Sequence, residues 1–369
     1  MSKDKGSSTG SSTRVASFEI HHTRFLDHNG EVTGELPEFT RDSANLISLY
    51  RAMVRTRIFD KKAVALQRTG QLGTFASSLG QEASFVGIGS AMRTEDVLLP
   101  TYRESGAMFI RGVTMTELLL YWGGDERGMD YAGPREDFPI CVPIATHLPH
   151  AVGVAYAMKL RRQPRVAVCT LGDGATSKGD FYEALNMAGA WQLPVVFVVC
   201  NNEWAISVPR RAQTHAQTLA QKAIAGEIEG EQVDGNDVIA VRHCVSRAIE
   251  KARSGDGPSL IEALSYRMSD HTTADDASRY RAKEELEKQA INDPITRLNT
   301  YLIGNNLLTE KDREALEAEC AAEVEAAAKE YLATPPPPSK AMFDYLYETL
   351  PASLVAQREF ATKRGSGNA

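Results

Sequence analysis

The sequence predicts an α/β fold in which helices flank a doubly wound parallel sheet. Three apolar runs, at residues 166–171, 195–200 and 259–264, lack the alternation of apolar and polar residues that marks a strand with one face in water. Stretches with helical spacing separate these runs, so strand and helix alternate through the middle of the chain. The chain has 369 residues, 43% of them hydrophobic, which is enough to bury a sizeable core.

The segments before the sheet are expected to pass from disorder to helix. Residues 1–15 are rich in Ser and Gly and poor in apolar residues, which predicts a disordered tail. Residues 16–41 contain the turn signal His28-Asn29-Gly30 and predict an N-terminal arm, extended or folded as a small hairpin. The first strong helix covers residues 42–68, because apolar residues recur there at helical spacing until Thr69-Gly70 ends it.

The later elements complete the alternation and set the domain limits. Four helices and one short buried strand are expected around the three apolar runs, the helices at residues 81–92, 146–162, 180–191 and 236–253 and the strand at residues 97–100. A long helix rich in Ala and Glu follows at residues 309–332, and a run of prolines ends it. We therefore expect one domain over residues 42–333 and a C-terminal segment over residues 334–369. The aromatic stretch of that segment fits docking to a partner and packing on its own domain equally well.

Composition argues against several classes of protein. The net charge is -7, from 41 basic and 48 acidic residues, and without a long basic run the chain is a poor candidate for binding nucleic acid. A bilayer span needs about 20 apolar residues, and the apolar runs are far shorter, so we expect no membrane segment. Five scattered cysteines, none in a CxxC pair, predict thiols in a reducing compartment rather than disulfides or a zinc site.

Polar residues follow two of the predicted strands at the point where each strand ends. Gly172-Asp173-Gly174-Ala175 comes after the run at 166–171, and Asn201-Asn202 after the run at 195–200. In open parallel sheets, ligands bind at this edge. The glycines let backbone N–H groups approach a phosphate, and Asp173 and Asn202 offer the oxygen ligands that Mg²⁺ prefers. The sequence therefore predicts a metal that bridges these oxygens and a diphosphate.

Neither of the commoner phosphate motifs explains this pattern. Ser177 occupies the place of the third glycine in GxGxxG, which disfavours a Rossmann dehydrogenase, and GxxxxGK[ST] is absent. Gly-Asp-Gly alone would more often be a turn. The ordered combination of strand, Gly-Asp-Gly, helix, strand and Asn-Asn is far more specific.

That combination is similar to the thiamine-diphosphate signature. The surrounding sequence, from Gly172 to Glu183 and from Asn201 to Ser207, resembles the α subunit of the E1 component of 2-oxo acid dehydrogenase complexes. The resemblance runs from about residue 46 to residue 281, and more weakly to the end. Other matching blocks are Leu66-Gln67-Arg68, Gly80-Gln81-Glu82-Ala83, Pro100-Thr101-Tyr102-Arg103-Glu104, Tyr266-Arg267 and the active-site loop from Asp270 to Arg281.

The resemblance implies a role for each of a set of residues. The diphosphate would be held by Tyr102, Arg103 and the backbone of Gly172, Gly174 and Ala175. Mg²⁺ would be held by the side chains of Asp173 and Asn202 and the carbonyl of Trp204. Val142 and Ile144 would line the aminopyrimidine, with Ile144 as the wedge that bends the cofactor. His271, on a mobile loop, would be the catalytic residue near the diphosphate and the reacting carbon.

The resemblance also implies an activity and partners. The chain would decarboxylate a 2-oxo acid, with pyruvate as the favoured substrate, using thiamine diphosphate and Mg²⁺, and would reductively acylate the lipoyl domain of E2. An E1 β subunit would supply the carboxylate beside the aminopyrimidine, in an α2β2 heterotetramer. The branched-chain 2-oxo acid enzyme, acetoin dehydrogenase and a non-catalytic scaffold subunit remain alternatives. A bacterial cytoplasmic location is expected, with the mitochondrial matrix left open.

Several positions qualify these expectations. Relatives often carry a further active-site histidine where this chain has residues 128–133, so Tyr131 is a candidate substitute. Cys200 stands where branched-chain members often have Arg, which favours pyruvate. Thr272 matches the position of a phosphorylated serine in some relatives, but this match alone does not predict regulation.

The segment at 141–147 resembles a potassium loop, with matching Pro143 and Thr146. His147 and His150, spaced i, i+3 without an acidic third ligand, predict packing or capping rather than a metal pair.

Overall fold

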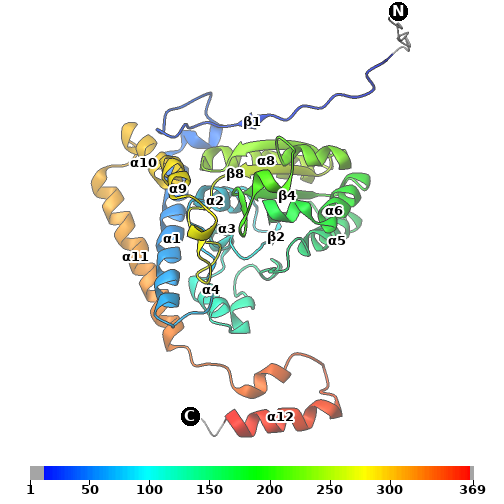
Figure 1. Cartoon of the computed structure of the whole chain (residues 1–369), viewed down its shortest axis with the longest axis vertical. Helices are drawn as coiled ribbons and strands as arrows, with labels where there is room; N and C mark the ends of the chain where they lie inside the picture. Colours follow the sequence, from blue (N-terminus) through cyan, green and yellow to red (C-terminus); the bar gives the residue numbers. More distant parts are fainter. Residues whose placement is uncertain (1–11, 366–369) are drawn as a thin grey trace, which may run out of the picture.

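A parallel sheet lies at the centre of the molecule (Figure 1). It has six strands in the order β1-β7-β8-β4-β3-β2. The computed structural model describes residues 12–365. The strands are β1 (His22–Thr23), β2 (Val97–Leu99), β3 (Ala167–Gly172), β4 (Val195–Asn201), β7 (Glu229–Asp234) and β8 (Ser259–Leu264). Every neighbouring pair is parallel, so all strands end at one edge. The predicted fold class is confirmed.

Helices cover both faces of the sheet. Successive side chains of a strand point to opposite faces, and those of β4 enter two separate cores. Val196 and Val198 pack in a cluster with residues of α1 (Ser43–Arg68), α2 (Glu82–Ala91) and α8 (Val238–Arg253). Val195 and Phe197 pack in a second cluster with residues of α5 (His147–Leu160) and α6 (Gly179–Ala190). Burial on both faces explains why the strands show no period-2 alternation.

Several elements were not expected from the sequence. They are the strand β7 and the helices α3 (Ser105–Arg111), α4 (Met115–Trp122), α9 (Lys283–Gln289) and α10 (Pro294–Gly304). Two of these helices begin at recognisable caps. The Thr114 hydroxyl accepts from the Glu117 N–H in a capping box, and Asp293 caps α10, which has proline in its first turn.

The N-terminal arm is both extended and hairpin-like. Its β1 joins the edge of the sheet, and Leu26 then forms an antiparallel bridge with Val32. The turn between them contains Gly30 with φ +76°, a conformation that favours glycine. Residues 1–11 of the expected tail lie outside the described residues.

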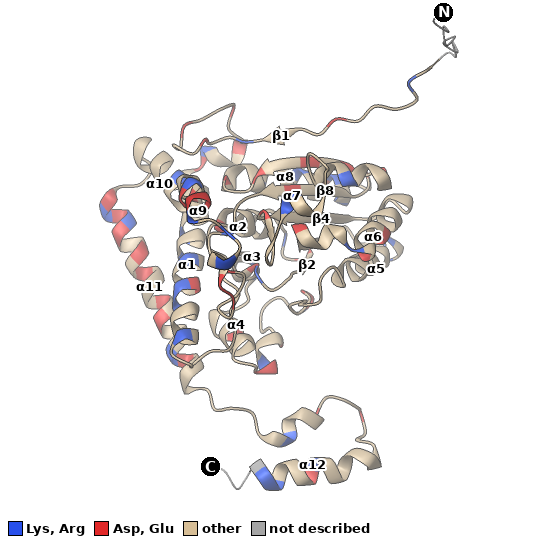
Figure 2. Ribbon diagram, in the orientation of Figure 1, with Lys and Arg blue, Asp and Glu red and all other residues tan. Residues whose placement is uncertain are grey.

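The long helix α11 (Glu310–Ala333) packs along α1 through opposite charges, visible in Figure 2 as acidic residues on α11 beside basic residues on α1. Arg51 donates to Glu319 at 2.7 Å and to Glu323 at 2.6 Å. After α11 the chain leaves the body and ends in η7 (Ser339–Phe343) and α12 (Ala352–Gly365) (Figure 1). None of the helices within residues 12–365 has the length and apolarity needed to span a membrane.

A buried ion pair joins α8 to the start of the sheet. Arg253, near the C-terminus of α8, donates to both carboxylate oxygens of Asp96, at 3.0 and 2.9 Å. The Asp96 side chain is fully buried and also accepts from the Val166 N–H at 3.0 Å. Removing one partner of such a pair leaves the other charge buried and uncompensated.

We expect Asp96→Ala to lower the free energy of unfolding by about 3–5 kcal/mol, because the Arg253 guanidinium loses its buried counter-charge and keeps only the half-exposed Glu250. Lys283→Ala, which breaks a pair whose side chains are 83% and 62% exposed, should change it little. Urea denaturation followed by circular dichroism measures both. Equal midpoints for the two variants would contradict the role given to the buried pair.

Candidate active site

A cavity of about 510 Å³ opens at the carboxyl ends of β3 and β4. This volume lies within the roughly 300–1,000 Å³ typical of ligand pockets. The structure brings every residue of the predicted set to its wall, namely Tyr102, Arg103, Val142, Ile144, Gly172, Asp173, Gly174, Ala175, Asn202, Trp204 and His271. These residues lie up to 169 positions apart in the sequence. They meet at one cavity because the parallel strands that lead to them end at the same edge of the sheet.

The register of the sheet explains how Asp173 and Asn202 reach the same wall. Gly172 of β3 pairs with Cys200 of β4, so the chain leaves both strands at the same level. Asp173 then begins the short helix η3 (Asp173–Ser177), and Asn202 begins a turn. Both side chains are buried, with 2% and 7% exposure.

The Asp173 carboxylate has no charged hydrogen-bond partner within residues 12–365, although the nearby positive charge of Arg267 opposes the effect of burial on its pKa. It accepts a hydrogen bond from the Gln213 amide at 2.7 Å, and none of the ion pairs found in residues 12–365 includes it. Burial raises the pKa of Asp173. A buried carboxylate bound only to neutral groups is costly unless a cation accompanies it, which fits a hard metal ion.

Asn202 and Trp204 offer two further oxygens. The Asn202 amide nitrogen donates to Gln81 Oε1 at 2.9 Å, and Asn202 Oδ1 accepts a weak bond from the Trp204 N–H at 3.3 Å. The Trp204 carbonyl accepts one long bond, 3.4 Å from Arg267, and keeps a second lone pair. In the described part of the chain, no three His, Cys, Asp or Glu side chains form a metal-binding group. A metal here would therefore depend on one carboxylate with amide and carbonyl oxygens.

Hydrogen-bond donors face the same cavity. The Gln81 side chain is fully buried, and its Nε2 has no partner among the described residues. Arg103 is 5% exposed, and its guanidinium donates to the carbonyls of Ser77 and His271 and forms no ion pair within residues 12–365. A Cβ at Gly174 would lie 2.7 Å from the Cβ of Ala205, so glycine is required there and no side chain covers its backbone. Unused donors and an uncompensated cation fit an anionic group.

His271 lies against Arg103 and Tyr102. Its Nδ1 is 3.3 Å from Arg103 Nη2, and its ring meets the Tyr102 ring edge-on at 6.1 Å. Burial, followed by the positive charge of Arg103, lowers the pKa of His271 to about 4. The imidazole is therefore neutral near pH 7, with Nδ1 as acceptor and the proton on Nε2.

The loop that carries His271, residues 269–281, is held by hydrogen bonds rather than by the ion pairs its charges suggest. Asp275 accepts from the His271 N–H at 2.9 Å and from the Tyr280 hydroxyl. Asp270 accepts from the Ala277 N–H at 3.0 Å. The Arg281 guanidinium donates to the Arg267 carbonyl.

Two residues of the site received no role from the sequence. Gln81 belongs to a block that matches the family, yet side-chain amides carry no chemical signature of their own. Gln213 is 40 positions from the Asp173 that it contacts, and no sequence pattern links the two.

Other candidates are placed elsewhere. Tyr131 lies in the hydrophobic core, 4% exposed, and does not line the cavity, so the structure gives no support to it as a substitute proton donor. His147 is buried with its Nε2 2.6 Å from the Thr170 carbonyl, and His150 lies near the Phe138 ring. The two histidines therefore pack separately, as predicted. The Pro143 carbonyl accepts from the Thr146 N–H at 3.3 Å, and potassium at this loop stays a prediction.

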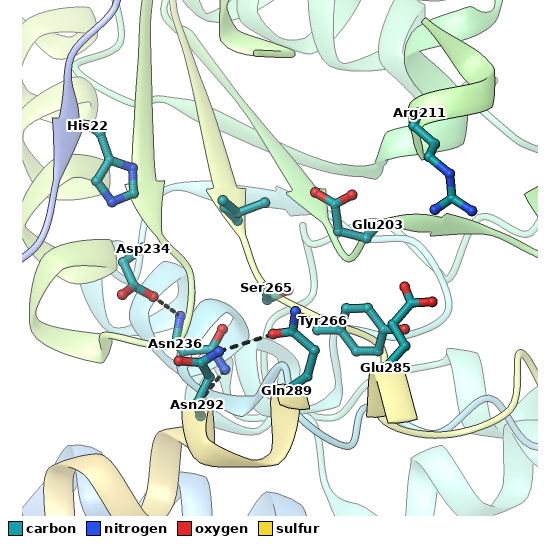
Figure 3. A pocket seen from close by; sticks show the side chains of 11 residues that line it. His22, Glu203, Arg211, Asp234, Asn236, Ser265, Tyr266, Glu285, Gln289 and Asn292 are labelled. Atoms are coloured by element: carbon teal, nitrogen blue, oxygen red, sulfur yellow. Dashed lines mark hydrogen bonds between the residues drawn. The ribbon is translucent and has the colours of Figure 1, made fainter. Parts of the chain in front are cut away.

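A second cavity, of about 320 Å³, also lies at the carboxyl edge, near the ends of β7 and β8 (Figure 3). Its lining contains three carboxylates, those of Glu203, Asp234 and Glu285, and one guanidinium, that of Arg211. Burial raises the pKa of Glu203, and Glu285 adds to this effect. None of the residues expected to bind the cofactor lines this second cavity, whereas all of them line the first, which favours the first cavity as the cofactor site.

Comparison with known proteins agrees with this geometry. The family model described as "Dehydrogenase E1 component" matches residues 50–340. A relative from Mycoplasma genitalium is 37% identical over 337 residues, which cover 91% of this chain and 94% of the relative. A relative from Acholeplasma laidlawii is 42% identical over 299 residues, 81% of this chain and 87% of the relative.

A third relative, from Staphylococcus aureus strain Mu50, is 38% identical over 353 residues, 95% of this chain and 94% of the relative. All three are named pyruvate dehydrogenase E1 component subunit alpha. Both the family model and these alignments span the strands and loops that form the cavity. The chain therefore belongs to the dehydrogenase E1 component family.

Proposed function

We propose that this chain is the α subunit of a thiamine-diphosphate-dependent pyruvate dehydrogenase E1, which decarboxylates pyruvate and passes the acetyl group to a lipoyl group of E2. The observation that carries the proposal is the meeting of all the predicted cofactor and metal residues at one cavity. The names of the relatives favour pyruvate over branched-chain 2-oxo acids. Their bacterial sources favour a cytoplasmic location.

The cavity supplies complementary donors for a metal and a diphosphate. Asp173, Asn202 and the Trp204 carbonyl would hold Mg²⁺, whose preference is for oxygen ligands. Arg103, Tyr102 and the bare backbone at Gly174 would hold the diphosphate. Thiamine diphosphate, when bound, supplies the carbon nucleophile that adds to a 2-oxo acid and accepts the electrons released with CO₂.

We propose that His271 is the acid–base residue of this site. Its neutral ring can donate a hydrogen bond from Nε2 while Arg103 donates to Nδ1. An anion bound at Arg103 offsets the positive charge that lowers the pKa of His271, so the pKa should rise from about 4 toward the ordinary value when the cavity is filled. We assign proton exchange during transfer to the lipoyl group to this residue.

A partner subunit is part of the proposal. Val142, Ile144 and Ile206 line the cavity yet are 52%, 47% and 57% exposed, which favours a second chain covering its open side. We propose that an E1 β subunit covers it and completes the site. The C-terminal segment, residues 334–369, exposes Tyr345 and Leu346 and is proposed to dock on that subunit, leaving residues 42–333 as the cofactor-binding domain.

Co-expression of the chain with its β subunit tests the proposed substrate. We expect the purified complex to decarboxylate pyruvate with at least tenfold higher kcat/KM than 3-methyl-2-oxobutanoate, a difference of about 1.4 kcal/mol. The α chain alone should be inactive. Preference for the branched substrate would refute the pyruvate assignment, and full turnover by α alone would refute the two-chain site.

Asp173→Ala should abolish Mg²⁺-dependent binding of thiamine diphosphate, because it removes the one charged ligand. Calorimetric titration of the α/β complex with thiamine diphosphate, with and without Mg²⁺, measures the effect. Asp276→Ala, on the His271 loop, is a control that leaves the cavity wall unchanged. Unaltered affinity in Asp173→Ala would remove the metal from this site.

His271→Ala should fold normally and lose about 10²–10⁴-fold in the rate of lipoyl acetylation, the range for losing an acid–base group. Decarboxylation measured with an artificial electron acceptor should suffer less, because it omits the transfer step. Steady-state rates in both assays decide the matter. Small and equal losses would show that His271 is only a structural residue of the loop.

A further inference from the structure

The chain returns to the Asp173 carboxylate by a short folded segment, residues 203–213. After Asn202 it turns at Glu203, with φ 68°, and forms the two-stranded hairpin of β5 (Trp204–Ala205) and β6 (Val208–Pro209). The Arg210 N–H donates to the Glu203 carbonyl at 2.8 Å and closes the segment. The short helix α7 (Arg210–Gln213) then contacts η3, which begins at Asp173.

Both N–H bonds of the Gln213 amide are used in this position. Nε2 donates to Asp173 Oδ2 at 2.7 Å and more weakly to the Val208 carbonyl at 3.3 Å. The amide is therefore tied to the hairpin at one side and to the carboxylate at the other. One segment thus offers the Trp204 carbonyl as a metal ligand and fixes the orientation of a second ligand.

We infer that Gln213 is a positioning residue that orients the Asp173 carboxylate for metal binding, an inference that rests on the proposed function. A neutral donor on Oδ2 fixes the rotation of the carboxylate and leaves Oδ1 for a cation. It also leaves the negative charge in place, which a lysine or arginine at this position would cancel. Groups that hydrogen-bond a metal ligand in this way typically contribute 10–100-fold to metal affinity.

Manganese binding tests the inference without relying on turnover. The full chain is purified with its β subunit and titrated with Mn²⁺ at a fixed excess of thiamine diphosphate, and free Mn²⁺ is measured by electron paramagnetic resonance against a titration without protein. We expect Gln213→Ala and Gln213→Met each to weaken Mn²⁺ binding by about 10–100-fold. The methionine variant keeps the length and most of the volume of the side chain and loses only its polar groups.

Arg211→Ala is the matched control on the same helix, because Arg211 is exposed and lines the other cavity. It should bind Mn²⁺ as the unmodified protein does. In steady-state assays, Gln213→Met should raise the Mg²⁺ concentration needed for half-maximal activity by a similar factor and recover kcat at saturating Mg²⁺. A purely structural role would instead lower kcat at every Mg²⁺ concentration.

Asp173→Ala distinguishes a failure of the positioning role of Gln213 from a failure of the proposed metal site. If Asp173→Ala loses Mn²⁺ binding while Gln213→Met binds Mn²⁺ with the affinity of the unmodified protein, the positioning role is overturned and the proposed metal site remains supported. Unchanged Mn²⁺ binding in Asp173→Ala would overturn both. A loss in Gln213→Met that is absent from Arg211→Ala supports the inference.

Discussion

Uncompensated charge at the carboxyl edge of β3 and β4 is the constraint on which this site depends. Asp173 is buried beside a neutral amide, and two buried arginines lie near it without ion-pair partners among the described residues. Arg103 donates to the carbonyls of Ser77 and His271, and Arg267 to those of Trp204 and Ile206. Such burial is costly in an empty cavity. A divalent cation and a diphosphate together would satisfy the Asp173 carboxylate and the Arg103 guanidinium, which both line the cavity.

The same arginines organise the loops that form the wall. Arg267 is fully buried and ties the segment at 203–213 to Tyr280, whose hydroxyl accepts at 2.9 Å. Arg103 ties the loop of His271 to the segment before α2 through Ser77. Because these bonds go to neutral carbonyl and hydroxyl oxygens, the arginines hold the loops in place while keeping their charge. The loop of His271 and the segment at 203–213 are thereby linked to one another through two arginines rather than through packing alone.

The sequence was informative wherever an element is buried on both faces or carries a motif. β3, β4 and β8 are continuous apolar runs, and Gly172 to Ala175 with Asn202 marks their edge. β7 was missed because Glu229, Glu231 and Asp234 make it read as a loop, and it is a strand because β8 and β1 pair with its backbone. Gln81 and Gln213 were missed because their roles arise from tertiary contacts. The lowered pKa of His271 likewise depends on burial and on Arg103, which lies 168 positions away.

Locating the metal directly tests the central claim that the cavity at β3 and β4, rather than the carboxylate-rich cavity at β7 and β8, holds the cofactor. Crystals of the α/β complex grown with thiamine diphosphate and Mn²⁺ would give an anomalous peak at the metal. The account predicts one peak bounded by Asp173, Asn202 Oδ1 and the Trp204 carbonyl, with the diphosphate extending toward Arg103. A peak between Glu203 and Glu285, or none beside Asp173 in a complex that turns over pyruvate, would contradict it.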